Sequence, residues 1–320
     1  MKIALLGDVM LGRLVNERLL TETPEYPWGD TLPILKSMDV RIANLECVIS
    51  DIGTPWSLTP KMFHFRSDAK NVESLIAAHM DIVSLANNHV LDYQEEALAC
   101  MLKLLDANHI CHAGAGKTLD EAMQPALVEF AGKTIGCIAV TDNEEEWAAG
   151  KSRAGIFYVP IDVEDRRAKA LFQQVENVRK RVDLLVVSLH WGPNWGYEVP
   201  SEQIPFARTL IDRGADIVFG HSGHVFRGIE IYRGKPIFYC AGDFIDDYMV
   251  DERERNDESF IFVVDDMKRI DLYPTVITDF QARLAPPDRQ KEILVKMKHL
   301  CEQLGTPCSV QENIGCIEIG

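Results

Sequence analysis

The chain has 320 residues, 47% of them hydrophobic and 26% charged, so it can bury one large core or two small ones. The formal net charge of −16 argues against nucleic acid or anionic membranes as partners, because both reward a basic surface. The negative net charge does not exclude anionic substrates, since a bound metal can supply local positive charge. No run approaches the roughly 20 apolar residues of a membrane span, and no secretory signal precedes the first predicted strand, so we expect a cytoplasmic protein.

Strand-like and helix-like runs alternate along most of the chain. Apolar spacing predicts strands at residues 2–9, 41–46, 81–87 and 184–190, and a hairpin of residues 126–130 and 134–140. Helices are expected at residues 14–20, 31–38, 71–79, 93–107, 163–179 and 202–213. Further on, antiparallel strands are expected at residues 229–232, 235–240, 260–264 and 269–276, with a last helix at 290–303. This alternation predicts two sheets with helices outside them.

The cysteines indicate a reducing environment. All 8 are scattered, with no C-x-x-C pair, and several lie inside apolar runs. We therefore expect reduced, mostly buried thiols and no thiolate metal site, with Cys308 and Cys316 left open.

The most informative stretch is Gly220-His221-Ser222-Gly223-His224, directly after the apolar run 215–219. Two imidazoles three residues apart in such a loop can face the same space, and neutral imidazole is the commonest protein ligand for divalent metals. Four other strand-like runs end in Gly7-Asp8, Ala43-Asn44-Leu45-Glu46, Ala86-Asn87-Asn88-His89 and His190-Trp191-Gly192. Because ligands bind beyond the carboxyl ends of strands in α/β sheets, we expect one mouth to gather Asp8, Glu46, Asn88, His89, His190, His221 and His224.

These side chains predict a site for divalent metal. Two carboxylates, one amide oxygen and up to four imidazoles, without a thiolate, suit Mn²⁺, Zn²⁺, Fe or Mg²⁺. There are ligands enough for two ions with one bridging carboxylate, and two ions roughly 3.5–4 Å apart can stabilise both attacking and leaving oxygens. His89 is the candidate proton donor, because Asp92 lies one helical turn later and can fix its tautomer.

Each of these residues also has a structural alternative. Asp8 alone could cap a helix, and Glu46 could be a surface residue. Asn87 and Asn88 together are typical of a turn, so we expect only Asn88 to be a ligand. Without partners at suggestive spacing, structural or surface roles are expected for His64, His79, His109, His112 and His299.

Together these segments resemble the CapA family of bacterial capsule and poly-γ-glutamate biosynthesis proteins, which is similar in turn to the calcineurin-like metallophosphatases. The matching stretches include Gly7-Asp8-Val9-Met10, Ser84-Leu85-Ala86-Asn87-Asn88-His89 and Gly242-Asp243-Phe244-Ile245, in the family's order. The resemblance implies an α/β fold, a four-layer α/β/β/α sandwich with a dinuclear metal centre. Residues 1–285 would form that domain, and residues 286–320 a C-terminal helix and tail packed on it.

Carried over by position, the resemblance implies a role for each ligand. Asp8 and His224 would hold one metal, Glu46 would bridge, and the second metal would be held by Asn88, His190 and His221. His89 would be the acid–base residue.

The chain also departs from the pattern of its relatives. Metallophosphatases usually carry a histidine where this chain has Met10, so we expect the first metal to bind more weakly than the second. Ser222-Gly223 stands where much of the family has a histidine and a proline, Asn194 replaces a more usual glutamate, and Asp243 a more usual asparagine. These changes leave the substrate open.

We expect a metal-dependent hydrolase that acts on a peptide-like substrate, γ-glutamyl substrates included, or on a phosphorylated small molecule. One alternative is a peptide epimerase that uses the metals to stabilise an enolate. The other is a non-catalytic accessory protein of capsule or poly-γ-glutamate synthesis, which would bind a polymer-synthesis partner. A fold by itself does not choose among these three.

Overall fold

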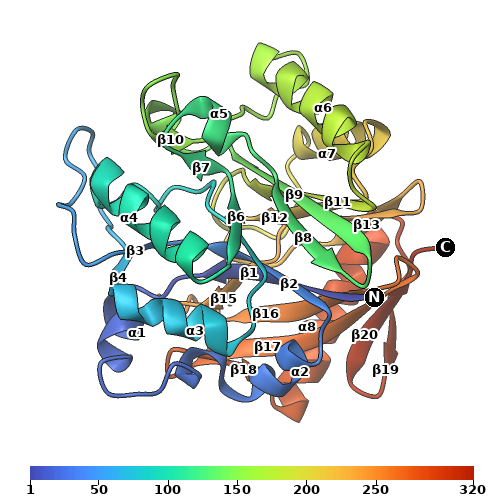
Figure 1. Ribbon diagram of the computed structural model, residues 1–320. Coiled ribbons are helices and arrows are strands. Elements are labelled where there is room, and N and C mark those ends of the chain that lie inside the picture. Colours follow the sequence, from blue (N-terminus) through green and yellow to red (C-terminus); the bar gives the residue numbers. More distant parts are fainter.

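Two β-sheets pack face to face in the computed structural model, which describes residues 1–320 (Figure 1). The first sheet has the spatial order β19 (Ser309–Gln311), β20 (Ile314–Glu318), β17 (Arg269–Thr278), β16 (Glu258–Asp265), β1 (Lys2–Val9), β2 (Val40–Leu45), β5 (Ile82–Ser84) and β6 (Cys111–Ala113). Two further strands flank this path: β15 (Asp243–Ile245) pairs with β1, and β18 (Gln281–Leu284) pairs with β17.

The second sheet has the order β13 (Ile229–Tyr232), β14 (Lys235–Phe238), β12 (Ile217–His221), β11 (Leu184–His190), β9 (Lys133–Thr141) and β8 (Ala126–Phe130). Strands β14, β12, β11 and β9 are mutually parallel, as are β1, β2, β5 and β6 in the first sheet. Two short ribbons pair β3 (Val48–Ile49) with β4 (Arg66–Ser67), and β7 (Ala115–Gly116) with β10 (Gly155–Ile156).

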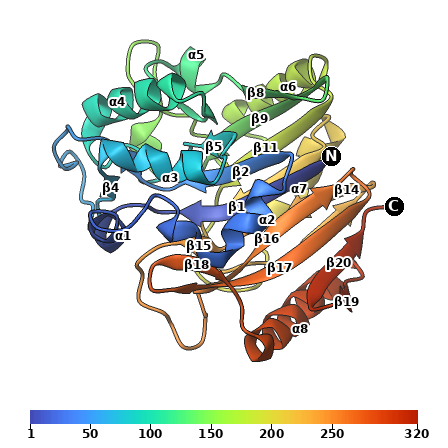
Figure 2. The ribbon, with the colours of Figure 1, turned by 60° about the horizontal axis from the view of Figure 1, so that its bottom comes forward.

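Helices cover the outer faces of both sheets (Figures 1 and 2). The first sheet is covered by α1 (Arg13–Arg18), α2 (Leu32–Lys36), α3 (Val72–Ala77) and α4 (Gln94–Ala107). The second is covered by α5 (Leu119–Ala122), α6 (Arg166–Arg179) and α7 (Gln203–Asp212). Short 3-10 turns are η1 (Tyr26–Thr31), η2 (Ala69–Asn71) and η3 (Glu145–Trp147). None of the helices has the length and apolar character that a bilayer crossing requires.

The alternation of side chains along the strands produces the layers. In β1, Ala4 and Leu6 pack into the core beneath α1–α4, whereas Ile3 and Leu5 pack into the core between the sheets. In β11, Leu184 and Val186 likewise face the inter-sheet core, while the intervening residues face α6 and α7. Since every central strand is buried on both faces, its apolar run is nearly continuous. The predicted four-layer α/β/β/α sandwich is confirmed.

The last part of the chain completes the inter-sheet core. Helix α8 (Pro287–Gln303) contacts β13, β17 and β20, and it buries Ile293, Met297 and Leu300 between the sheets. Strands β19 and β20 form a hairpin that extends the first sheet beyond β17, and this hairpin was not among the expected elements. The expected strand at residues 81–87 is shorter, because β5 ends at Ser84 and the chain turns before Asn88.

Candidate metal centre

The carboxyl ends of the parallel strands in both sheets open into one space. His190 and His221 are direct partners on neighbouring strands β11 and β12 of the second sheet. Asp8 is the partner of Asn44 on β2 and of Asp243 on β15 in the first sheet. The two sets meet across the sandwich, where Nδ1 of His221 lies 3.5 Å from Oδ1 of Asp8. Residues far apart in sequence thus share one mouth, as the strand-end argument predicts.

One group of possible ligands consists of Asp8, His190 and His221. The Nδ1 atoms of the two histidines are 2.9 Å apart, and Nδ1 of His190 is 3.8 Å from Oδ1 of Asp8. The Ser188 hydroxyl lies 2.8 Å from Nε2 of His221 and holds that ring in place. Burial lowers the pKa of His221 to about 3 and that of His190 well below its usual range, so both rings stay neutral, the form that binds metal.

A second group shares Asp8 and adds His224 and Asp243. One ligand atom from each of the three lies within 4.8 Å of the others. Nδ1 of His224 is 3.0 and 3.2 Å from the two carboxylate oxygens of Asp243. Asp8 is fixed between the groups, because it accepts hydrogen bonds from the Asn44 side chain at 2.7 Å and from the backbone N–H of Ser222 at 3.1 Å.

Glu46 lies between the histidines and the acidic side chains. Its Oε1 is 3.7 Å from Nε2 of His190 and 4.0 Å from Nε2 of His89. Its Oε2 is buried and has no hydrogen-bond partner. Burial, followed by the neighbouring charges of Asp8 and Asp243, raises the pKa of Glu46 well above its usual range. A buried carboxylate oxygen without a partner is costly, and a divalent cation would satisfy it, so these residues fit a metal.

The two adjacent asparagines differ in the way the sequence predicts. Oδ1 of Asn88 lies 3.0 Å from Nε2 of His190, within the ligand cluster. Asn87 makes backbone-organising contacts instead: its side chain donates to the Leu45 carbonyl at 2.8 Å and accepts from the His89 N–H at 3.0 Å. Asn87 therefore shapes the loop after β5, and Asn88 presents its amide oxygen to the site.

His89 sits at the edge of the cluster with Asp92 behind it. Nδ1 of His89 is 2.6 Å from Oδ2 of Asp92, and the Phe65 ring stacks on the imidazole with centroids 3.8 Å apart. Burial lowers the pKa of His89 well below its usual range, so its ring is neutral, and burial raises the pKa of Asp92 to about 7. Nε2 of His89 faces Glu46, which leaves this nitrogen for proton exchange in the cleft.

A cleft of about 600 Å³ opens over Asn88, His89 and His224. Aromatic rings and two basic side chains line the rest of it, among them Arg13, Lys61, Phe65, Trp195 and Tyr248. Sequence reasoning did not single out Lys61, which follows an irregular loop. Its ammonium group donates to the Asn88 carbonyl at 2.6 Å and lies 3.5 Å from Oδ1 of Asp92, so it braces the segment that carries His89.

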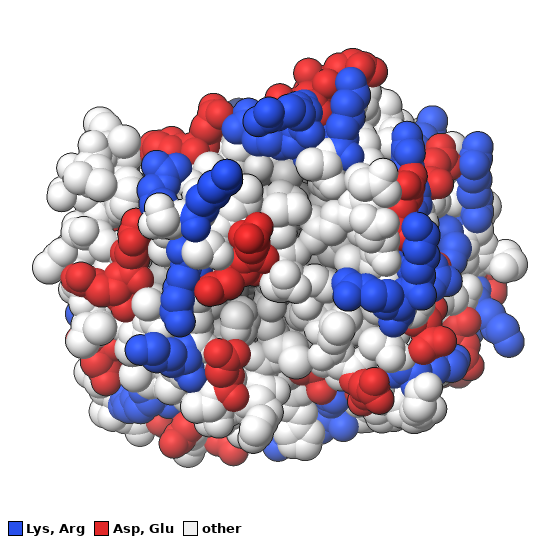
Figure 3. Space-filling view, turned by 45° about the horizontal axis from the view of Figure 1, so that its top comes forward, with Lys and Arg blue, Asp and Glu red and all other residues white.

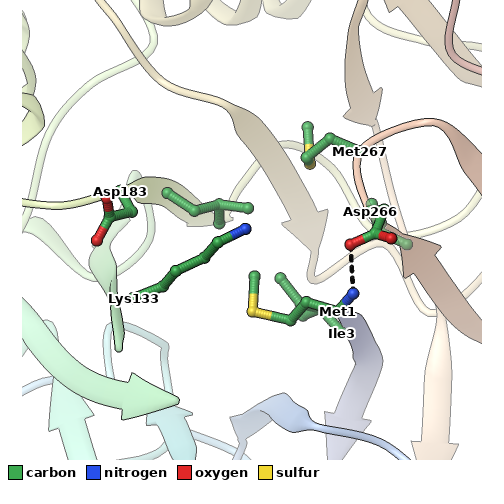
Figure 4. A pocket seen from close by; sticks show the side chains of 8 residues that line it. Met1, Ile3, Lys133, Asp183, Asp266 and Met267 are labelled. Atoms are coloured by element: carbon green, nitrogen blue, oxygen red, sulfur yellow. Dashed lines mark hydrogen bonds and ion pairs between the residues drawn. The ribbon is translucent and has the colours of Figure 1, made fainter. Parts of the chain in front are cut away.

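A second cavity, of about 220 Å³, lies at the amino ends of the strands (Figure 4). Met1, Lys133 and Asp183 line it, at or beside the start of β1, β9 and β11, and the Met1 amino group pairs with Asp266. No histidine lines this cavity. Both groups of ligand atoms that lie close enough to share an ion are at the other end of the strands.

Three further acidic or polar residues at the mouth were not predicted as site residues. Asp243 was noted only as a departure from the family pattern, and Asp246 and Tyr248 follow it in the segment after β15. Asp246 is buried and Tyr248 is half-buried, and burial and neighbouring carboxylates raise the pKa of each well above its usual range. Met10 is buried too, and its sulfur lies 3.0 Å from the Gly12 N–H.

Charge on the molecular surface is mixed. On the face shown in Figure 3, Lys and Arg side chains are interspersed with Asp and Glu and do not gather into one basic patch. This face therefore does not offer a continuous basic surface of the kind that nucleic acid binding requires.

Comparison with known proteins places the chain beside capsule synthesis proteins. The family described as bacterial capsule synthesis protein PGA_cap matches residues 2–248. A probable polyglutamine synthesis accessory protein of Mycobacterium tuberculosis is 37% identical over 250 residues, which are 76% of this chain and 65% of that protein. The PGA biosynthesis protein CapA of Bacillus subtilis is 28% identical over 243 residues, 75% of this chain and 62% of the relative. The match thus spans a little under two thirds of each relative's length.

Solved structures overlap with this fold only in part. A hypothetical protein from Thermus thermophilus gives a TM-score of 0.47 at 16% identity, covering 88% of this chain and 96% of its own. A purple acid phosphatase from yellow lupin seeds gives 0.38 at 8% identity, covering 89% of this chain and 52% of its own.

Proposed function

The chain belongs to the bacterial capsule synthesis family PGA_cap, and from that premise we propose that it is a metal-dependent hydrolase with its site at the strand-end mouth. The observation that carries the proposal is His89. Its Nδ1 is held by Asp92 at 2.6 Å while its Nε2 faces Glu46, so an oriented proton carrier stands directly beside a metal-competent cluster.

The donor set supports two divalent ions. We assign one ion to Asp8 and His224, the other to Asn88, His190 and His221, and a shared position to Glu46. The shared role of Glu46 is supported by its buried, unpartnered Oε2 and by its Oε1, which lies 3.7 Å from Nε2 of His190. Asp8 belongs to both groups of possible ligands, so the two proposed ions would be neighbours. The oxygen and imidazole donors suit Mn²⁺, Zn²⁺ or Fe, with Mg²⁺ as a further candidate. When bound, such ions supply positive charge and Lewis acidity to an oxygen of the substrate.

The protein's own residues would position the proton. Asp92 accepts from Nδ1 of His89 and is itself held by the Phe65 N–H at 2.6 Å. The Phe65 ring covers one face of the imidazole, which limits its rotation. With Nδ1 donating to Asp92, Nε2 of the neutral imidazole carries no proton, so this nitrogen would first take a proton and then give it to the leaving group.

The cleft supports a peptide-like substrate with anionic groups. Arg13 offers its guanidinium beside the rings of Phe63, Phe65 and Tyr248, and only its Nε is paired, with Asp247 at 3.0 Å. A carboxylate-bearing chain such as a γ-glutamyl peptide would find both a cation and apolar walls there. The names of the relatives, which refer to polyglutamine and PGA synthesis, favour this class over a phosphorylated small molecule.

A second candidate function is that of an accessory protein. The Mycobacterium tuberculosis relative is named an accessory protein of polyglutamine synthesis, which favours binding to a polymer-synthesis partner. The two candidates differ in their need for His89, since a protein that only binds a partner has no use for an oriented proton carrier beside a metal.

The test is an activity screen of metal-loaded protein against γ-glutamyl amides, peptides and phosphoesters, with deuterium exchange at peptide α-carbons followed in parallel. We expect cleavage of a γ-glutamyl or peptide bond, and a loss of about 10²–10⁴-fold in turnover for His89→Ala with metal content retained. Exchange without cleavage would replace the hydrolase with an epimerase. No turnover, together with tight binding to a synthesis partner, would replace it with the accessory role.

A further inference from the structure

Asp243 occupies a place in the mouth that the assigned ligands do not explain. Strand β15 runs parallel to β1, and Asp243 is the direct partner of Asp8 across the pair. The strands approach closely because position 7 has no side chain: a Cβ atom on Gly7 would lie 1.8 Å from the Gly242 carbonyl oxygen. Partners on adjacent strands project to the same face of a sheet, so both carboxylates are directed to the same space.

The distances around Asp243 match those of metal ligands. Its oxygens lie 3.0 and 3.2 Å from Nδ1 of His224, and one oxygen belongs to the group with Asp8 and His224 whose ligand atoms are within 4.8 Å of one another. Neighbouring ligands of a six-coordinate ion are roughly 3 Å apart when each bond is roughly 2.1 Å long. The separation observed between Asp243 and His224 is therefore suited to two donors on one ion.

The charge balance also favours a cation here. No lysine or arginine forms an ion pair with Asp8, Glu46, Asp243 or Asp246, although all four are buried. Lys61 and Arg13, the basic residues that line the cleft, are engaged by Asp92 and Asp247. Two oxygens in the cluster, Oε2 of Glu46 and Oδ2 of Asp246, have no hydrogen-bond partner. Imidazoles alone do not neutralise this many buried acids.

Two departures from the family pattern fall at the same ion. Position 10, where related metallophosphatases usually carry a histidine, holds Met10, whose thioether is a poor donor for hard ions. Position 243, where an asparagine is more usual, holds an aspartate beside Asp8 and His224. Position 10 therefore lacks a metal ligand, and position 243 offers a charged oxygen donor.

We propose that Asp243 is a direct ligand of the ion held by Asp8 and His224, and that it replaces the donor missing at position 10. The inference rests on the proposed dinuclear site. It gives that ion two carboxylates and one imidazole from the strands β1 and β15 and the loop after β12. The alternative is that Asp243 only orients His224 by accepting a hydrogen bond from Nδ1.

The test compares Asp243→Asn with wild-type protein in metal content and in calorimetric titration with Mn²⁺ and Zn²⁺. The amide oxygen of asparagine can still accept from Nδ1 of His224, but it brings no charge to an ion. At metal concentrations that saturate the wild-type protein, we expect the metal content of Asp243→Asn to fall from two ions per chain to one. The affinity for the second ion should weaken by more than about 100-fold, which exceeds the usual effect of losing a residue that only orients a ligand. Met10→His combined with Asp243→Asn should regain the second ion.

Asp247→Asn is the matched control. Asp247 lies four residues from Asp243, and its carboxylate accepts from Arg13 and from the Leu14 N–H, each at 3.0 Å. It should therefore keep the wild-type metal content. Full metal content and affinity in Asp243→Asn, or no gain in the double variant over Asp243→Asn, would overturn the inference. A wild-type protein that binds no ion would instead overturn the proposed function, so the two failures can be told apart.

Discussion

Buried acidic side chains have basic partners in one part of this molecule and lack them in another. Away from the mouth, each has a basic partner: Glu230 pairs with Arg208 at 2.6 Å, Glu258 with Lys296 at 3.1 Å, and Asp216 with Lys235. At the mouth, Glu46 and Asp246 are buried without a lysine or arginine. An unpaired buried acid either takes up a proton or is compensated by a cation from outside the chain. The comparison makes the mouth the candidate cation site of the molecule.

Removal of metal should have the largest effect on stability. A ligand that binds only the folded state at 1,000 times its Kd stabilises that state by about 4 kcal/mol. Chelation should therefore lower Tm by roughly 6 °C for a chain of this size. Differential scanning calorimetry of protein with and without EDTA, followed by metal add-back, measures the effect. An unchanged Tm would mean that the acids at the mouth are not compensated by metal.

Arg208→Ala tests how much a basic partner stabilises a buried acid away from the mouth. The change leaves Glu230, whose side chain is only 5% exposed, without its basic partner and with the Tyr239 hydroxyl as its remaining donor. Because the Arg208 side chain is 44% exposed and partly screened, we expect a loss of about 1–2 kcal/mol in the free energy of unfolding. Denaturant unfolding with metal held constant measures it. A loss below about 0.3 kcal/mol would show that the pairing of buried acids elsewhere matters little.

Glu46→Gln should stabilise the metal-free protein, whereas Arg208→Ala should destabilise the protein. The neutral amide has nearly the same shape and removes one acid from a buried cluster of like groups, so the free energy of unfolding should rise by about 1 kcal/mol. The same variant should bind less metal and gain less Tm on metal addition than wild type. A metal-free variant that is less stable than metal-free wild type would contradict the claim that Glu46 lacks a compensating charge in the chain.

Much of the mouth could be predicted because its residues follow local patterns. Asp8, Asn88, His190 and His221 each come at or just after the end of a strand-like apolar run, and the rule for parallel strands gathers them without further knowledge. The same patterns located most helices and predicted two sheets with helices outside them, whereas the four-layer sandwich was implied by the family resemblance. Their ligand roles remain predictions, since proximity alone does not show a bound ion.

The remaining features depend on tertiary pairing that no local pattern reports. Strand β15 has three residues, and only its register with β1 brings Asp243 beside Asp8. Lys61 comes from an irregular loop, and its role follows from contacts with Asp92 and the Asn88 carbonyl. The β19–β20 hairpin has a fully exposed first strand, so no buried alternation marks it in the sequence.

The most direct measurement is the metal content, by inductively coupled plasma mass spectrometry, of protein purified without chelator and equilibrated with Mn²⁺ or Zn²⁺. The account predicts about two ions per chain in wild type and at most one in His221→Ala and in His224→Ala, each of which removes a ligand from a different ion. Wild-type metal content in both variants would show that the strand-end mouth is not the metal site.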